Sequence, residues 1–98
     1  MEKIVRNGEV AVAVSYGFGA GWSTWNDVDP MDARFNQLFL DGKYEEAADL
    51  CDQLDLGYAN GAYDVVIRWV PEGTEFRITE YDGAEGIEYK HNTPWYMA

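Results

Sequence analysis

The sequence predicts an α+β domain in which an antiparallel sheet of about five strands carries two short helices on one face, in the order ββααβββ. Three observations predict this class. Asn7-Gly8 separates two β-type runs near the start, apolar residues recur at spacings of three and four in the middle, and residues 63–70 are rich in β-branched and aromatic side chains. A chain of 98 residues makes one domain, 1–98, which buries roughly two thirds of the surface that its unfolded form exposes.

The expected first hairpin joins residues 3–6 to residues 9–14. Asn7-Gly8 favours positive φ at both central positions of a two-residue turn. In the second strand the valines at positions 10, 12 and 14 face one way, whereas Ala11 and Ala13 face the other way. Because both faces are apolar, we expect this strand to lie inside the sheet, with its alanine face open to close approach by a helix or loop.

Two short helices are expected in the middle of the chain. Asp27 or Asp29 serves as the N-cap of the first helix, and Pro30 takes its first helical position. Apolar residues then recur at helical spacing as far as Asp41-Gly42, where the glycine suits a left-handed C-cap. The second helix covers about residues 43–54. Since only a short turn joins the helices, we expect them to pack as a corner or hairpin over the sheet.

The last third of the chain is predicted to be β again. The strands cover residues 63–70, 75–81 and 84–89. Pro71-Glu72-Gly73 and Asp82-Gly83 supply the turns between them. Trp95-Tyr96-Met97 is too apolar for a free tail, so we expect it to dock as a short edge strand or as a plug on the core.

Apolar runs and cysteine content place the chain in the cytoplasm. The longest apolar run, Val10 to Val14, is far shorter than the roughly 20 residues of a membrane span. No charged start followed by an apolar segment marks a leader. Cys51 is the one cysteine, so no internal disulfide can form, which suits a reducing compartment. We therefore expect a cytoplasmic protein without a membrane partner.

The loop Ser15–Asn26 alternates glycines with large aromatic rings. Its candidate partner- or ligand-binding residues are Tyr16, Phe18, Trp22 and Trp25. In one interpretation the tryptophans stack on a base or another flat ring while backbone amides hold polar groups. In the other, which is the more common use of such residues, they cover the hydrophobic sheet.

Motifs for bound cofactors and for catalysis do not fit. The glycine pattern 17–21 lacks the third glycine of a dinucleotide loop, whose place Trp22 takes, and it lacks the lysine of a phosphate loop. Asp27–Asp32 lacks the further oxygen ligands of a calcium loop. Cys51 and His91 cannot close a tetrahedral metal site, and Cys51 is expected to be structural. We expect no metal, cofactor or catalytic group, which favours a non-enzymatic role.

Charge is concentrated in the middle of the chain. Residues 27–56 carry nine acids against two basic side chains, so they contribute −7 to the net charge of −11. The second helix turns four of these acids outward, Glu45, Glu46, Asp49 and Asp52. A surface of this sign repels phosphate backbones, which argues against direct binding of nucleic acid. It suits a basic protein as partner.

Several segments resemble those of a known group of proteins. They are Lys3–Arg6 with Asn7-Gly8, Gly17–Asn26, Trp69–Gly73, Phe76–Ile78 and Glu80–Gly83. Together they resemble a family of small acidic proteins encoded by tailed phages and prophages, with Gly-Phe-Gly-Ala-Gly-Trp-Ser-Thr-Trp-Asn as the most specific string. The resemblance covers both ends of the chain and is weakest across the two helices. It implies a phage accessory role in a bacterial host cytoplasm, and it supplies no active site.

Three functions stay open at this point. In the first, the protein is a non-enzymatic binder that inhibits a basic host protein of defence or nucleic-acid handling, with the acidic helix for attraction and the aromatic loop as anchor. In the second, it is a binding protein or small enzyme for a nucleotide-like metabolite, with the loop, Trp69 or Trp95 framing the pocket. In the third, it is a structural homodimer that pairs exposed sheet edges.

Overall fold

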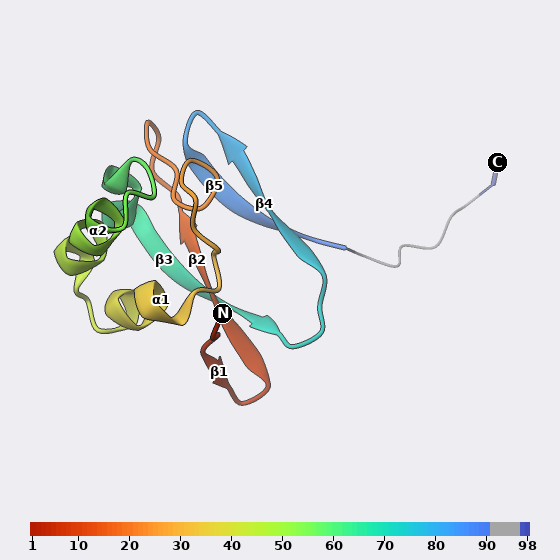
Figure 1. Ribbon diagram of the computed structural model, residues 1–98. Coiled ribbons are helices and arrows are strands. Elements are labelled where there is room, and N and C mark those ends of the chain that lie inside the picture. Colours follow the sequence, from red (N-terminus) through yellow and green to blue (C-terminus); the bar gives the residue numbers. More distant parts are fainter. Residues whose placement is uncertain (91–96) are drawn as a thin grey trace.

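The computed structural model describes residues 1–90 and 97–98, and it has the predicted α+β class (Figure 1). The elements follow one another as β1 (Val5–Arg6), β2 (Glu9–Ser15), α1 (Ala33–Leu40), α2 (Tyr44–Gln53), the 3-10 helix η1 (Ala59–Asp64), β3 (Val65–Pro71), β4 (Phe76–Tyr81) and β5 (Ala84–Tyr89). The expected docking of Trp95 and Tyr96 lies outside the described residues.

Strand β2 is the middle strand of a three-stranded antiparallel sheet with the order β1-β2-β3. The first turn is the predicted one, since Asn7 and Gly8 have φ values of 51° and 76°. Along β2 the register pairs Val10 with Val70 and Ala13 with Ile67. Because paired residues share a face, β2 and β3 together present one alanine face and one valine face, both largely apolar.

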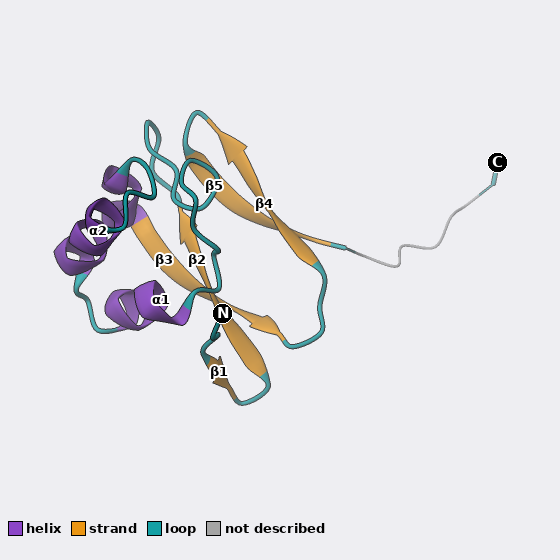
Figure 2. Ribbon diagram, viewed as in Figure 1, coloured by secondary structure: helices purple, strands orange, loops and turns teal. Residues whose placement is uncertain are grey.

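The helices cover the alanine face, as predicted (Figure 2). Ala13 lies in one buried cluster with Phe35 and Phe39 of α1 and with Cys51 of α2. The small alanine side chains let α1 approach closely enough for the Asn36 side-chain amide to donate to the Ala11 carbonyl oxygen at 3.1 Å. Within residues 1–90 and 97–98, no helix has the length and apolar character that a membrane crossing requires.

The five strands do not form one sheet, because β4 and β5 make a separate two-stranded sheet. This hairpin lies on the valine face, where Ile78 and Ile87 pack against Val12 and Val14. Lying face to face over β2 and β3, it buries apolar side chains that an edge-to-edge extension of the sheet would leave in water. The predicted antiparallel pairing of these strands is present, with Asp82-Gly83 as their turn.

The first helix begins later than predicted. Its N-cap is Asp32, whose side chain accepts the Arg34 N–H, and not Asp27 or Asp29. Pro30 does not start the helix, because its carbonyl oxygen accepts the Ala13 N–H at 2.8 Å. Pro30 therefore lies beside β2, on the same side as β1, and the helix can begin only after it.

Candidate functional site

The loop of residues 16–26 is packed between two other segments. On one side, a Cβ atom added to Gly83 in the β4–β5 turn would lie 2.5 Å from the Ala20 nitrogen. On the other side, a Cβ atom added to Gly61 of η1 would overlap the carbonyl oxygen of Gly21. Figure 1 shows the loop, in orange, beside the β4–β5 turn. Both neighbours thus need glycine for the loop to come this close.

A buried carboxylate, that of Glu85 in β5, holds the loop. Only 3% of Glu85 is exposed. Its Oε1 accepts the Ser15 N–H at 2.9 Å. Its Oε2 accepts the N–H groups of Trp22 and Thr24, each at 2.9 Å, and the Thr24 hydroxyl at 2.6 Å. Within the described residues no lysine or arginine pairs with Glu85, so these four donors supply its stabilisation.

Glu85 is not among the site residues that the sequence predicts. A signal for it exists, because Glu85 shares the inward face of β5 with Ile87 and Tyr89, which pack against the valine cluster. A lone acid at an apolar position of a strand indicates either an edge or a buried acceptor for unpaired donors.

Trp22 is a core residue and does not belong to an accessible binding surface. Its side chain is completely buried. The ring meets Phe35 edge-on with the centroids 5.2 Å apart, and it meets Phe39 in the same way at 5.4 Å. The correction has a physical reason: the alanine face of the sheet leaves space that a large ring fills, and burial of aromatic surface is favourable.

The other three candidate rings of the loop are exposed, by 44% for Tyr16, 75% for Phe18 and 41% for Trp25. The Tyr16 hydroxyl accepts from Arg68 at 2.7 Å. The Trp25 Nε1–H donates to the Glu80 carboxylate at 3.2 Å. Tyr16 and Trp25 are therefore fixed by polar contacts, whereas Phe18 presents an apolar ring to solvent.

Tyr81 adds a fourth exposed ring from β4, with 73% of its surface exposed. It directly precedes Asp82, whose carbonyl oxygen accepts the Gly19 N–H at 2.6 Å. The backbone beside Phe18 and the backbone beside Tyr81 are thus in contact. We call Tyr16, Phe18, Trp25 and Tyr81 the aromatic end of the molecule.

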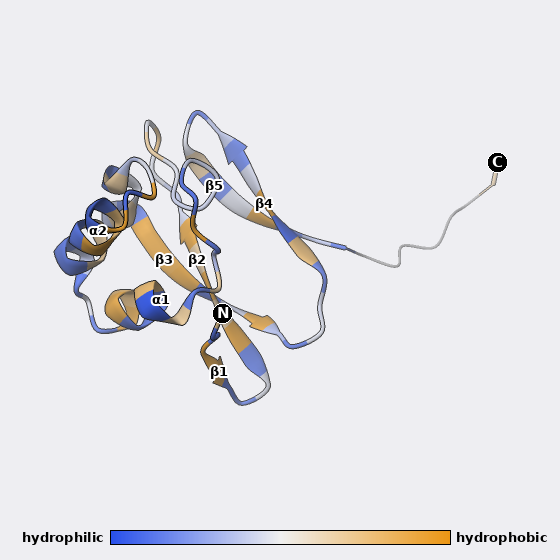
Figure 3. Cartoon of the chain, viewed as in Figure 1, coloured by the Kyte–Doolittle hydropathy of each residue, from blue (hydrophilic) through white to orange (hydrophobic). Residues whose placement is uncertain are grey.

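The four acids predicted to point outward from α2 do so. Glu45, Glu46, Asp49 and Asp52 are all exposed. The ion pairs of the described residues use other acids, namely Asp32, Glu75 and Glu88. In Figure 3 hydrophilic bands alternate with hydrophobic ones along α2, as an amphipathic helix requires. The four acids, here called the acidic face, therefore have no intramolecular cation among the described residues.

Helix η1 lies between the aromatic end and α2. It packs against α2, and its Gly61 touches the loop. The structure thus places the acidic face in the helical layer and the rings at one end of the two sheets, so the candidate residues form two neighbouring surfaces and not one pocket.

Cys51 lies in the core beneath the acidic face. Burial raises the pKa of the Cys51 thiol, and the charge of Asp52 adds to this shift. A thiol of this kind is a poor nucleophile at neutral pH. Among the described residues, no group of three or more His, Cys, Asp and Glu side chains could hold a metal ion.

Comparison of the chain with known protein families, with curated proteins and with solved structures finds no match.

Proposed function

We propose that the protein is a small acidic accessory protein of the phage or prophage type. It acts as a non-enzymatic binder of a basic protein of the bacterial host. Inhibition of a host protein of defence or nucleic-acid handling is the effect we assign to this binding. One observation carries the proposal: the four acids of α2 are exposed and have no cation of their own among the described residues.

Unpaired acids are suited to fast recognition of a basic partner. No intramolecular ion pair has to be broken before the acidic face meets a lysine or arginine. Charges of one sign on one helix steer an oppositely charged protein during diffusion and raise the association rate. Their effect falls with salt, because the screening length shrinks to about 8 Å at physiological ionic strength.

The aromatic end supplies an anchor that charge alone does not provide. Phe18 is 75% exposed on a loop that Glu85 holds in place. A preorganised ring loses little conformational entropy when a partner covers it. Aromatic residues of this kind often contribute more than 1 kcal/mol each to protein interfaces.

The alternative of a flat ligand between two tryptophans loses one of its partners. Trp22 is buried against Phe35 and Phe39, so of the two tryptophans only Trp25 remains for stacking. A nucleotide-like metabolite would bind there with one open face, which is less favourable than a clamp.

A pull-down from bacterial lysate tests the proposal. The wild type is compared with a variant in which the acidic face is neutralised by Glu45→Gln, Glu46→Gln, Asp49→Asn and Asp52→Asn. We expect the wild type to retain a basic protein in about 50 mM NaCl and to release it in about 500 mM NaCl. The neutralised variant is expected to retain none. The control loses the same charge elsewhere, through Glu2→Gln, Glu9→Gln, Glu72→Gln and Glu75→Gln, and is expected to behave like the wild type.

The aromatic anchor is tested separately with Phe18→Ser. We expect this variant to bind the captured protein about tenfold more weakly. Its free energy of unfolding should differ from that of the wild type by less than about 0.5 kcal/mol. Equal capture by the neutralised variant, or recovery of a small metabolite in place of a protein, would contradict the proposal.

A further inference from the structure

We propose that a groove beside β4 binds an extended peptide, which pairs with the free edge of β4 as an additional strand. The buried Val10 and Val70 form the floor of the groove, Met31 lines one side, and Phe76 and Ile78 of β4 line the other. We call it the β4 groove. It lies toward the other end of β4 from Tyr81, so the inference does not depend on the function proposed for the aromatic end and the acidic face.

The free edge of β4 offers main-chain groups that no strand pairs. In an antiparallel strand, successive residues turn their N–H and C=O groups to opposite sides. The Glu75 carbonyl oxygen accepts the Lys90 N–H at 2.9 Å, so Glu75 faces the β5 side. Phe76 and Ile78 are one and three residues further, so they turn their groups away from β5. Among the described residues, no other segment bonds to these groups.

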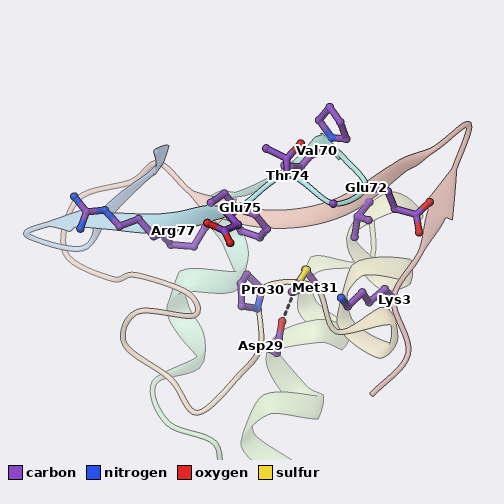
Figure 4. Close-up of a pocket in the computed structure, with 14 residues that line it drawn as sticks. Lys3, Asp29, Pro30, Met31, Val70, Glu72, Thr74, Glu75 and Arg77 are labelled. Carbon is purple, nitrogen blue, oxygen red and sulfur yellow. Dashed lines mark hydrogen bonds between the residues drawn. The ribbon is translucent and has the colours of Figure 1, made fainter. Parts of the chain in front are cut away.

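The volume and apolar floor of the β4 groove suit side chains of a bound segment. Its volume is about 740 Å³, within the ~300–1,000 Å³ that ligand sites commonly have. Val10 and Val70 are buried, while Met31, Phe76 and Ile78 are half-buried and keep apolar surface open to the groove. Figure 4 shows Met31 and Pro30 across the groove from the segment that carries Thr74 and Glu75.

An extended peptide matches both features, and other occupants match only one. A lipid chain or an apolar small molecule would cover the floor but leave the Phe76 and Ile78 groups without partners, at a cost of about 1–3 kcal/mol for each buried group. An added strand pairs with both residues, which are roughly 6.7 Å apart along β4. Every second side chain of that strand then points to the floor, as in strand addition by other peptide-binding domains.

The net charge of the whole chain, more than the mixed charges at the rim, indicates the polar character of the peptide. Figure 4 places Lys3 and Glu72 toward one end of the β4 groove and Glu75 and Arg77 toward the other. Glu75 is paired with Lys90 at 2.8 Å, and Arg77 is paired with Glu88 at 3.0 Å. Because the whole chain carries a net charge of −11, a peptide with basic ends is attracted to it.

The test uses two synthetic heptapeptides of one composition. The first, acetyl-Lys-Val-Thr-Val-Thr-Val-Lys-amide, alternates valine with threonine. The second, acetyl-Lys-Thr-Val-Val-Val-Thr-Lys-amide, does not alternate. We expect the alternating peptide to bind at least about tenfold more tightly, because all three of its valines reach one side of a strand. Titration by NMR measures both affinities.

Hydrogen exchange at single amides distinguishes strand addition from apolar adhesion. With the alternating peptide bound, we expect exchange at the Phe76 and Ile78 N–H groups to slow by about tenfold or more. The Arg77 and Thr79 N–H groups already face β5, so their exchange should stay nearly the same. Equal slowing at all four residues, or no slowing at Phe76 and Ile78, would overturn the proposal.

Two proline variants complete the test. Ile78→Pro removes a donor from the free edge of β4 but none that faces β5, and it is expected to weaken peptide binding by at least about tenfold. Ile67→Pro is the matched control. Since the Tyr16 N–H donates to the Asp64 carbonyl oxygen, Ile67 turns its groups away from β2 toward the free edge of β3, outside the β4 groove. Equal loss of binding in both variants would contradict the assigned site, and a poorly folded Ile78→Pro leaves the exchange pattern of the wild type to decide.

Discussion

Glu85 shows how one buried charge can organise a loop without an opposite charge beside it. Its carboxylate accepts two main-chain N–H groups of the loop, the N–H of Ser15 and the hydroxyl of Thr24. Four donors directed at one carboxylate replace much of the hydration that burial removes. The carboxylate also stabilises the loop, because these donors would otherwise be buried without acceptors.

Glu85→Gln tests this role. A glutamine amide can present its oxygen to Trp22 and Thr24 or to Ser15, but not to both, so at least one N–H must face the NH₂ group. We expect the free energy of unfolding to fall by roughly 2–4 kcal/mol in urea denaturation. Glu88→Gln, at a side chain that is 52% exposed, is the control and should change it by less than about 1 kcal/mol. Similar small losses in both variants would show that the loop does not depend on Glu85.

Asp32 links the start of α1 to pH. Burial by itself raises the pKa of the Asp32 carboxyl, but the hydrogen bonds from the Arg34 side chain and backbone, with the charge of Arg34, outweigh it and set the pKa below its ordinary value of 3.8. A carboxyl whose pKa is lowered by folding stabilises the protein above its unfolded pKa. This contribution disappears as the pH falls through the folded pKa.

Asp32→Asn should remove this pH dependence while retaining a good N-cap. We expect the variant to be less stable than the wild type at neutral pH, and the difference in unfolding free energy to shrink as the pH falls from about 6 toward 2. Chemical denaturation at a series of pH values measures the difference. A gap that stays constant over this range would contradict the assignment.

Among the secondary-structure elements, β2 determines which layer covers each face of the three-stranded sheet. Its alanine face admits α1 and a buried tryptophan, whereas its valine face carries the β4–β5 hairpin. The loop that follows β2 then has to pass between η1 and the β4–β5 turn. Glycines at these contacts set how closely the elements approach one another.

Gly61→Ala tests the contact between η1 and the loop. The new Cβ atom would overlap the carbonyl oxygen of Gly21, and backbone on both sides limits relaxation. We expect a loss of about 2–4 kcal/mol in unfolding free energy and a changed fluorescence spectrum of the neighbouring Trp22. Gly86→Ala is the control, since its Cβ would meet only the Thr79 hydroxyl, at 3.0 Å, and a side chain can rotate. A loss no larger than that of the control would show that η1 can move away.

Across the whole molecule, charge is compensated at few places. The described residues contain three ion pairs, while the chain carries 18 acids and 7 lysine or arginine side chains. The acidic face of α2 takes part in none of these pairs. Repulsion among its carboxylates is therefore a cost of the folded state that salt can reduce.

Salt should accordingly raise the melting temperature. Between about 20 mM and 500 mM NaCl the screening length falls severalfold, and we expect the wild type to melt at a higher temperature in the more concentrated solution. The melting temperature of the variant with a neutralised acidic face should rise less between the two salt concentrations. Calorimetry at both salt concentrations measures the two shifts, and an equal shift in both proteins would place the repulsion elsewhere.

Residues close together in the chain predict the α+β class, the β1–β2 and β4–β5 hairpins and the turns of those hairpins. Asn7-Gly8 and Asp82-Gly83 adopt positive φ as their residue types favour, and α2 differs from its predicted span by one residue at each end. The alternation of alanine and valine in β2 also predicted a central strand with two apolar faces. Each of these features depends on residues that are near one another in the chain.

Contacts between distant residues decided the rest. Whether Trp22 is exposed depends on Phe35 and Phe39. The start of α1 depends on the hydrogen bond between Ala13 and Pro30. The shape of the loop depends on Glu85, more than 60 residues later. Pattern and propensity predict the secondary structure of a segment. They do not identify the donor, ring or sheet face that packs against it. Only the tertiary structure settles that competition, because burial and hydrogen bonding are properties of the assembled elements.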